Sequence, residues 1–134
     1  MPDGRAKLVS LEPHWVEFMD PGSPFLMGTT AYLSPESLHG EAVDGRADVF
    51  SLGCTFYELV EGRKPFEGDS ALDVIPKILR DPPSRSHKAR DLNLPELQRI
   101  FDKALAKPKD SRYQSCVELS QDLERLRRRI ELRV

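Results

Sequence analysis

The stretch Asp48-Val-Phe-Ser-Leu-Gly53-Cys-Thr-Phe-Tyr57-Glu-Leu-Val-Glu61 decides the fold of this chain. Read at about 3.6 residues per turn, its apolar side chains cover almost the whole circumference of a helix. A helix that is apolar on all sides is either buried on all sides or spans a membrane. This one is too short to span a bilayer. We therefore predict a core helix with Asp48 as its N-cap and Gly62 as the left-handed residue that ends it.

Composition limits the class of protein. A chain of 134 residues is expected to form one domain with a modest core, and its net charge of −2 gives no global attraction to nucleic acid or anionic lipid. Nucleic acid is therefore not an expected partner. Neither a signal peptide nor a transmembrane run is visible, so no membrane partner is expected and the expected location is cytoplasmic. Cys54 and Cys116 lie in apolar helical patterns, which predicts two buried thiols in a reducing compartment.

The first half of the chain alternates between turns and short elements. Residues 2–9 indicate a hairpin turn and a short strand, and residues 11–27 an apolar loop. A short helical turn is expected over 35–38. Ser70 and Asp73 predict the start of a helix that runs to about residue 80, with a kink at Pro76. Residues 81–93 read as irregular.

Two further helices are predicted in the second half. Asn93 is expected to cap the first, with Glu96 reaching back and an apolar stripe at helical spacing behind it. Ser115 and Glu118 form a capping box for the second. Its apolar seam consists of Cys116, Leu119, Leu123, Leu126 and Ile130. The opposite side carries an arginine run, which indicates a solvated helix face; a contact with nucleic acid or a juxtamembrane surface is the alternative.

Four motifs, in order, resemble the second half of a serine/threonine protein kinase domain of the bacterial type. Gly28-Thr29-x-x-Tyr32-x-Ser34-Pro35-Glu36 resembles the Gly-Thr-x-x-Tyr-x-Ala-Pro-Glu sequence that closes the activation segment. The core helix resembles the central helix of the kinase C-lobe. The remaining two motifs are the turn at residues 63–66 and the arginine at position 112.

The resemblance implies a mainly α fold. We expect a kinase-like C-lobe fragment, in which the central buried helix is surrounded by three to four helices and preceded by a strand or hairpin remnant. Residues 1–27 would hold that remnant and an activation-segment-like loop. Residues 28–130 would form the helical C-lobe subdomain, and residues 131–134 a tail.

The resemblance also assigns roles to individual residues. Glu36 and Arg112 are expected to form a buried bidentate ion pair. Asp48 would, in a whole kinase, accept N–H groups of the catalytic loop. Gly28, Thr29 and Tyr32 correspond to the loop that contacts the substrate residue after the phosphorylated one, although Thr29 and Tyr32 could equally brace a turn. The candidate phosphorylation sites are Ser23, Thr29 and Thr30.

Several parts of a kinase are missing from these 134 residues. There is no Gly-rich loop, no His-Arg-Asp catalytic loop and no Asp-Phe-Gly, whose place is taken by Ser10-Leu11-Glu12. Phosphoryl transfer depends on those groups. We therefore assign no catalytic, ATP-binding or metal-binding residue and expect no cofactor in this chain, although the family uses ATP and Mg²⁺.

Three hypotheses remain open at this point. The chain is a kinase-like C-lobe fragment without catalysis of its own, a gene remnant or a binding module. Alternatively, it is part of a split or wrongly delimited Ser/Thr kinase, which would act on a protein substrate only when an N-terminal half complements it. The third hypothesis is an unrelated interaction module. Under the first two, the segments that normally cover residues 48–61 are absent, so a protein partner or self-association is expected there.

Overall fold

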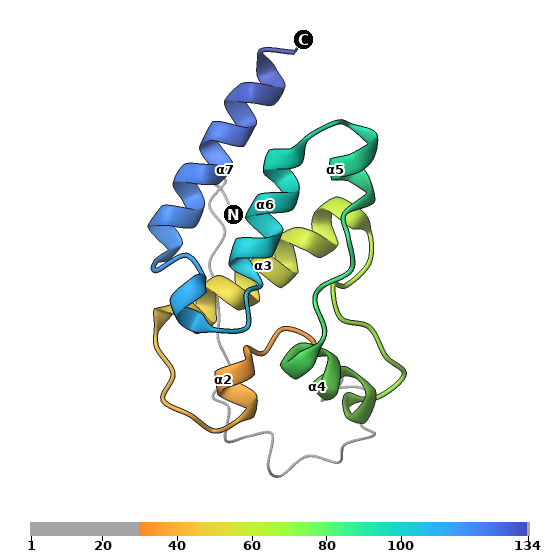
Figure 1. Ribbon diagram of the computed structural model, residues 1–134, viewed down its shortest axis with the longest axis vertical. Helices are drawn as coiled ribbons and strands as arrows, with labels where there is room; N and C mark the ends of the chain where they lie inside the picture. Colours follow the sequence, from red (N-terminus) through yellow and green to blue (C-terminus); the bar gives the residue numbers. More distant parts are fainter. Residues whose placement is uncertain (1–29, 134) are drawn as a thin grey trace, which may run out of the picture.

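The structure is a computed structural model that describes residues 30–133 (Figure 1). Its elements are α2 (Pro35–Leu38), α3 (Gly45–Glu61), α4 (Ala71–Arg80), α5 (His87–Asp91), α6 (Pro95–Ala104), the 3₁₀ turn η2 (Lys109–Ser111) and α7 (Cys116–Glu131). The described residues contain no strand, and the expected strand or hairpin lies outside them. The prediction of a mainly helical, kinase-like C-lobe fragment is confirmed.

Helix α3 lies at the centre of the fold. In Figure 1, α5, α6 and α7 lie on one side of it and α2 and α4 on the other. Tyr57 and Val49 pack into the cluster formed with α6 and α7. Phe50 and Cys54 pack into a second cluster with α4, where Phe66 folds back and stacks on Phe50 at 6.0 Å between ring centroids. One helix therefore supplies the core of both halves.

The predicted start and burial of α3 were partly wrong. The helix begins at Gly45, and its N-cap is Asp44 rather than Asp48, because the Asp44 carboxylate accepts the Arg46 N–H at 2.9 Å. Asp48 lies inside the first turn. Gly62 ends the helix with a φ of 74°, as predicted. The helix is not buried on all sides, since Leu59 is 79% exposed.

Gly53 is explained by close packing of α3 against the end of α6. A Cβ at this position would lie 2.9 Å from the Ala104 Cβ and 3.1 Å from the Leu105 Cδ2. The approaching groups are side chains. The missing Cβ lets the two helices contact each other directly.

The segment between α3 and α6 differs most from the predictions. Residues 81–93 are not wholly irregular, because α5 forms within them with Ser86 as its N-cap. Asn93 does not cap α6; it has a left-handed φ of 51°, and α6 follows Leu94 with Pro95 in its first turn. At α4, Ser70 makes no side-chain cap, and Asp73 instead accepts the Asp69 N–H at 3.2 Å.

Helix α7 begins at the predicted capping box. The Ser115 hydroxyl accepts the Glu118 N–H, and the Glu118 carboxylate accepts the N–H of Gln114. Of the predicted seam, Leu119 and Leu126 are buried, whereas the two end positions, Cys116 and Ile130, are exposed. The prediction of two buried thiols therefore holds for Cys54 only.

The arginine run of α7 forms salt bridges with acidic residues. Arg127 pairs with Glu124 and Glu131, and Arg125 pairs with Asp122. These i,i+3 and i,i+4 pairs are what a solvated helix face is expected to contain. No helix within residues 30–133 combines the length and hydrophobicity needed to cross a membrane.

Candidate functional site

Helix α2 carries the glutamate of the motif that closes the activation segment. Ser34 caps this short helix with its hydroxyl, and Pro35 occupies the first turn, where a missing N–H costs nothing. Glu36 follows and is directed inward by the helix. Its side chain is only 4% exposed and lies against Arg112, whose side chain is fully buried.

Glu36 and Arg112 form a bidentate ion pair with both N···O distances at 2.7 Å. Burial alone would raise the pKa of Glu36, but the hydrogen bonds and charge of Arg112 hold it below its ordinary value of 4.5. The pair joins residues 76 positions apart and fixes α2 against the segment before α7.

The remaining donors of Arg112 bind backbone carbonyl groups. Its Nε donates to Ala106, and its two terminal nitrogens donate to Arg46 and Lys107, at 2.8–2.9 Å. A guanidinium has five N–H donors, and each of them has an acceptor here. These five hydrogen bonds compensate for the cost of burying the positive charge of Arg112.

Tyr32 lies just before α2 and is bound to the middle of α3. Its hydroxyl donates to the Glu58 carboxylate, and the Ser51 hydroxyl donates to its carbonyl oxygen at 2.6 Å. Burial, together with the hydrogen bond and negative charge of Glu58, raises the pKa of Tyr32. The ammonium of Lys64 lies 5.7 Å from the centre of the Tyr32 ring. The chain just before α2 is therefore fixed to the central helix.

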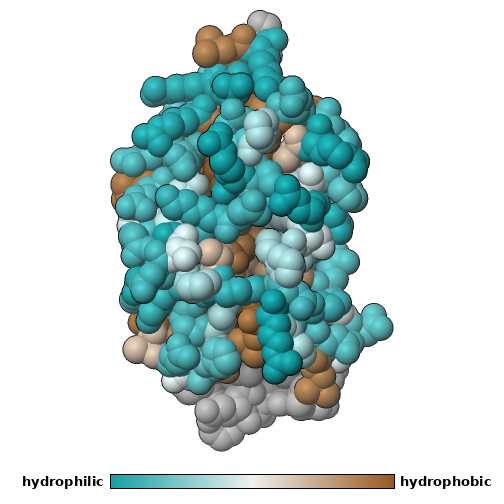
Figure 2. Space-filling model, in the orientation of Figure 1, coloured by the Kyte–Doolittle hydropathy of each residue, from teal (hydrophilic) through white to brown (hydrophobic). Residues whose placement is uncertain are grey.

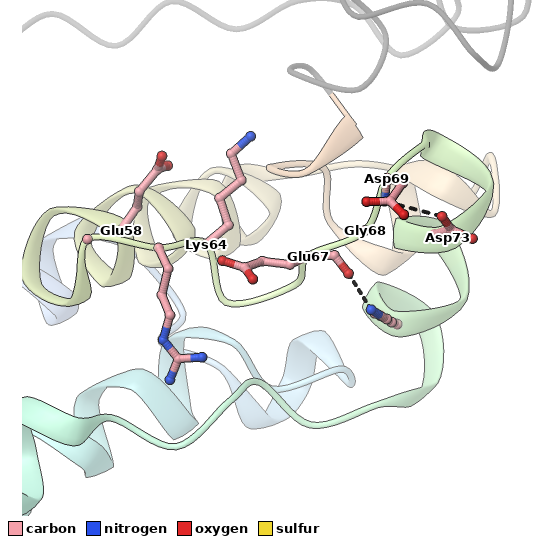
Figure 3. Close-up of a pocket in the computed structure, with 9 residues that line it drawn as sticks. Glu58, Lys64, Glu67, Gly68, Asp69 and Asp73 are labelled. Atoms are coloured by element: carbon pink, nitrogen blue, oxygen red, sulfur yellow. Dashed lines mark hydrogen bonds between the residues drawn. The ribbon is translucent and has the colours of Figure 1, made fainter.

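Glu58 also lines an open hollow of about 710 Å³ between the end of α3, the loop of residues 62–69 and the start of α4. Figure 3 shows the Glu58 and Lys64 side chains pointing in the same direction, with Glu67 lying across the hollow. The opposite wall is held by hydrogen bonds from the Asp69 N–H to Asp73 and from Lys77 to the Glu67 carbonyl.

The hollow is lined by seven charged side chains, and four of them, Glu58, Arg63, Asp73 and Lys77, already form hydrogen bonds within the protein. Four are acidic and three are basic: Glu58, Glu67, Asp69, Asp73, Arg63, Lys64 and Lys77. Among residues 30–133 none of them takes part in a salt bridge. Charged groups that line a hollow and are not paired can interact with the side chains of a bound peptide.

The other predicted site residues are placed as follows. Gly28, Thr29 and Ser23 lie outside the described residues. Thr30 is fully buried, and its hydroxyl has no hydrogen-bond partner among the described residues, so a modifying enzyme could reach it only if this segment opened. Asp48 is half-buried in the first turn of α3, and its side chain forms no hydrogen bond with another residue between 30 and 133.

Two residues of this region were not singled out from the sequence. Glu58 is one of the few polar residues in the predicted core helix, and that position was the available signal. Lys107 had none. Its ammonium lies 4.0 Å from the centre of the Phe66 ring and donates to the Lys77 carbonyl, and burial lowers its pKa to about 8.

The sequence also matches a known family. The model of the protein kinase domain matches residues 16–124. The chain belongs to the protein kinase domain family. It is 48% identical over 104 residues to the serine/threonine-protein kinase PknB of Mycolicibacterium smegmatis and 42% identical to the PknB of Mycobacterium leprae. A probable serine/threonine-protein kinase of Streptomyces coelicolor is 43% identical over 99 residues.

These matches cover most of this chain but only a small part of each relative. They include about three quarters of this chain but only 15–16% of each of these relatives. The protein kinase family uses ATP and magnesium. Within residues 30–133 no group of three or more His, Cys, Asp or Glu side chains could hold a metal ion.

Proposed function

We propose that this chain is a kinase C-lobe that binds a protein segment and does not transfer phosphate by itself. The observation that carries the proposal is the Tyr32–Glu58 contact beside a hollow with unpaired charges. This contact supports a peptide-facing side, whereas the sequence of 134 residues lacks the Gly-rich loop, the catalytic aspartate and Asp-Phe-Gly. A cytoplasmic location is part of this proposal.

The proposed roles of the motif residues follow from this arrangement. Gly28, Thr29 and Tyr32 form the loop that contacts the bound segment, and Glu58 anchors that loop through Tyr32. The ion pair of Glu36 and Arg112 holds the loop's far end. Phosphorylation of Ser23, Thr29 or Thr30 by another kinase would add negative charge to the part of the sequence that precedes α2.

Calorimetric titration with Mg-ATP tests the absence of catalysis. We expect no heat of binding and no transfer of labelled phosphate to a basic protein substrate. Micromolar nucleotide binding by the chain alone would refute the proposal. A kinase domain of one of the relatives, assayed in the same buffer, is the positive control.

Peptide binding is tested separately with Tyr32→Phe and Glu58→Gln. Tyr32→Phe removes the hydrogen bond to Glu58, and Glu58→Gln weakens it by removing the carboxylate charge, while both variants keep the size of the side chain. We expect weaker capture of peptides from a random peptide array, with little change in melting temperature. Arg127→Gln, on the solvated face of α7, is the control.

The second candidate is a split kinase, which the exposure of α3 favours. Leu59 is 79% exposed on the central helix, and Thr55, one turn earlier, is also exposed. A separately made N-terminal half would cover apolar surface there. Mixing the chain with the preceding part of the M. smegmatis PknB kinase domain should then give phosphorylation that requires ATP, and Leu59→Glu should abolish it. No activity in the mixture favours the non-catalytic C-lobe.

A further inference from the structure

Lys107, between α6 and η2, places its ammonium against an apolar cluster. Charged side chains are usually at the surface, and the face that Figure 2 shows is mostly hydrophilic. The Lys107 side chain is instead partly buried. Its ammonium lies 4.0 Å from the centre of the Phe66 ring and 5.9 Å from the centre of the Phe50 ring. Both rings belong to the cluster in which α4 packs against α3.

The Lys107 ammonium connects segments that are far apart in the sequence. It donates to the Lys77 carbonyl oxygen in α4 at 3.2 Å, and it lies over Phe66 in the loop of residues 62–69. In Figure 1, α4 lies beside α2, on the side of α3 opposite to α6. One side chain that follows α6 therefore holds both α4 and this loop.

The groups around the ammonium do not neutralise its charge. Within residues 30–133 Lys107 takes part in no salt bridge. On α3 it faces Cys54, whose thiol stays protonated because burial raises its pKa. At the end of α4 it faces Asp81, which is exposed, so water and salt screen that carboxylate. Before α7 it faces Arg112, a second cation, 5.2 Å from the centre of the same Phe50 ring.

The charged form of Lys107 is therefore disfavoured in the closed arrangement. Burial, with a smaller contribution from Arg112, lowers its pKa from 10.5 to about 8, because removing an ammonium from water costs more than contact with a ring face contributes. If α4 and the loop move away, Lys107 is in water and its pKa returns toward 10.5. The opened arrangement then binds more protons between about pH 8 and 10.5, so the closed one becomes more stable as the pH rises through this window.

We propose that Lys107 is a proton-linked switch that sets how firmly α4 and the loop of residues 62–69 are attached to α3 and α6. Loss of its proton removes an unpaired charge from the apolar cluster and leaves an amine that can still donate to the Lys77 carbonyl. Protonation restores the charge and favours opening. The same loop and helix line the hollow beside Glu58, so the switch also sets how rigid that hollow is. The inference does not rest on the proposed function, because its test involves no peptide.

Two measurements on the full chain test this proposal. NMR of the lysine side chains gives the midpoint of the Lys107 titration, and the signal is assigned by its absence from Lys107→Met. We expect a midpoint of about 8. Hydrogen exchange measures the opening of residues 71–80. After correction for the intrinsic pH dependence of exchange, these amides should be about tenfold better protected at pH 9 than at pH 7.

The variant Lys107→Met keeps an unbranched side chain but cannot carry a charge. At pH 7 it should protect residues 71–80 better than the wild type does, and its protection should change less than about twofold between pH 7 and pH 9. The matched control is Lys103→Met. The Lys103 ammonium also lies over a ring, 4.6 Å from the centre of Tyr113, but this side chain is exposed. The control should keep the tenfold rise of the wild type. A Lys107 midpoint near 10.5, or the same pH dependence in the wild type and Lys107→Met, would overturn the proposal.

Discussion

At the scale of single residues, Arg112 determines how α2, the start of α3 and the segment before α7 meet. The resemblance to kinases predicted its partnership with Glu36, and the two side chains do form a buried ion pair. The three carbonyl acceptors, on Arg46, Ala106 and Lys107, could not be predicted. Every residue has a carbonyl, so only the path of the folded backbone decides which of them reach the guanidinium.

Replacing Glu36 with Gln should destabilise the protein strongly. The variant leaves the Arg112 charge buried without a counterion, which typically costs about 3–5 kcal/mol. Urea unfolding measures the loss. The control is Glu131→Gln, which weakens an exposed pair with Arg127 and should cost less than about 1 kcal/mol. A loss from Glu36→Gln no larger than that of the control would show that the ion pair contributes little.

The lowered pKa of Glu36 predicts how the stability of the protein depends on pH. The pKa of Glu36 is lowered in the folded state, so the unfolded chain binds a proton first as the pH falls. The stabilisation by Glu36 is thus complete above its ordinary pKa of 4.5 and is lost as the pH falls through the folded-state value.

Urea midpoints between neutral pH and acidic pH measure this dependence. The slope below pH 4.5 should be steeper in the wild type than in Glu36→Gln, which has no carboxyl to titrate at this position. Other carboxylates contribute equally to both proteins. Identical slopes would contradict the assignment.

At the scale of elements, local signals predicted some helices well and failed for others. The helical turn at α2, the end of α3 at Gly62 and the capping box of α7 all depend on residues within one turn of the helix end. Helix α5 was missed because its first turn is also capped from outside. Glu61, at the end of α3, accepts the N–H groups of His87 and Lys88. A cap supplied by a distant element leaves no local pattern.

Replacing Gly53 with Ala should separate α3 from α6. The new Cβ would clash with the Ala104 Cβ at 2.9 Å, and overpacking of this kind costs about 1–3 kcal/mol. The higher helix propensity of Ala than of Gly offsets about 1 kcal/mol of this destabilisation. A net loss of up to about 2 kcal/mol is expected in the free energy of unfolding.

Gly45 provides the matched control, because a Cβ there has no heavy atom within 4 Å and the residue belongs to the same helix. Gly45→Ala should leave stability unchanged or raise it slightly. If Gly53→Ala were as stable as Gly45→Ala, the contact between α3 and α6 would be adaptable and the glycine would need another explanation.

At the scale of the whole molecule, the central position of α3 was predicted correctly. Its complete burial was also predicted, and the structure does not show it. The pattern of apolar residues reflects the surroundings of this helix in a complete kinase domain, as the family predicts. In this structure Leu59 remains largely exposed. A sequence pattern thus records where a helix could be buried, and the neighbouring segments decide whether it is.

Self-association through α3 should be sensitive to Leu59. Sedimentation velocity at increasing concentration is expected to show dimers or larger species. Leu59→Gln should weaken the association by about 1–2 kcal/mol, because less apolar area is buried. Leu72→Gln is the control, since Leu72 is 67% exposed on α4, away from the proposed contact. A monomeric wild type that binds no hydrophobic dye would argue against this surface.

The junction at Arg112 has a consequence for how the chain could be engineered or rearranged during evolution. Its guanidinium binds Glu36 on one side of the exposed loop of residues 39–44 and the Arg46 carbonyl on the other. Both ends of that loop are therefore fixed by a third segment and not by the loop itself. New chain termini or a guest domain introduced after Ala42 would lengthen the connection without moving either anchored end.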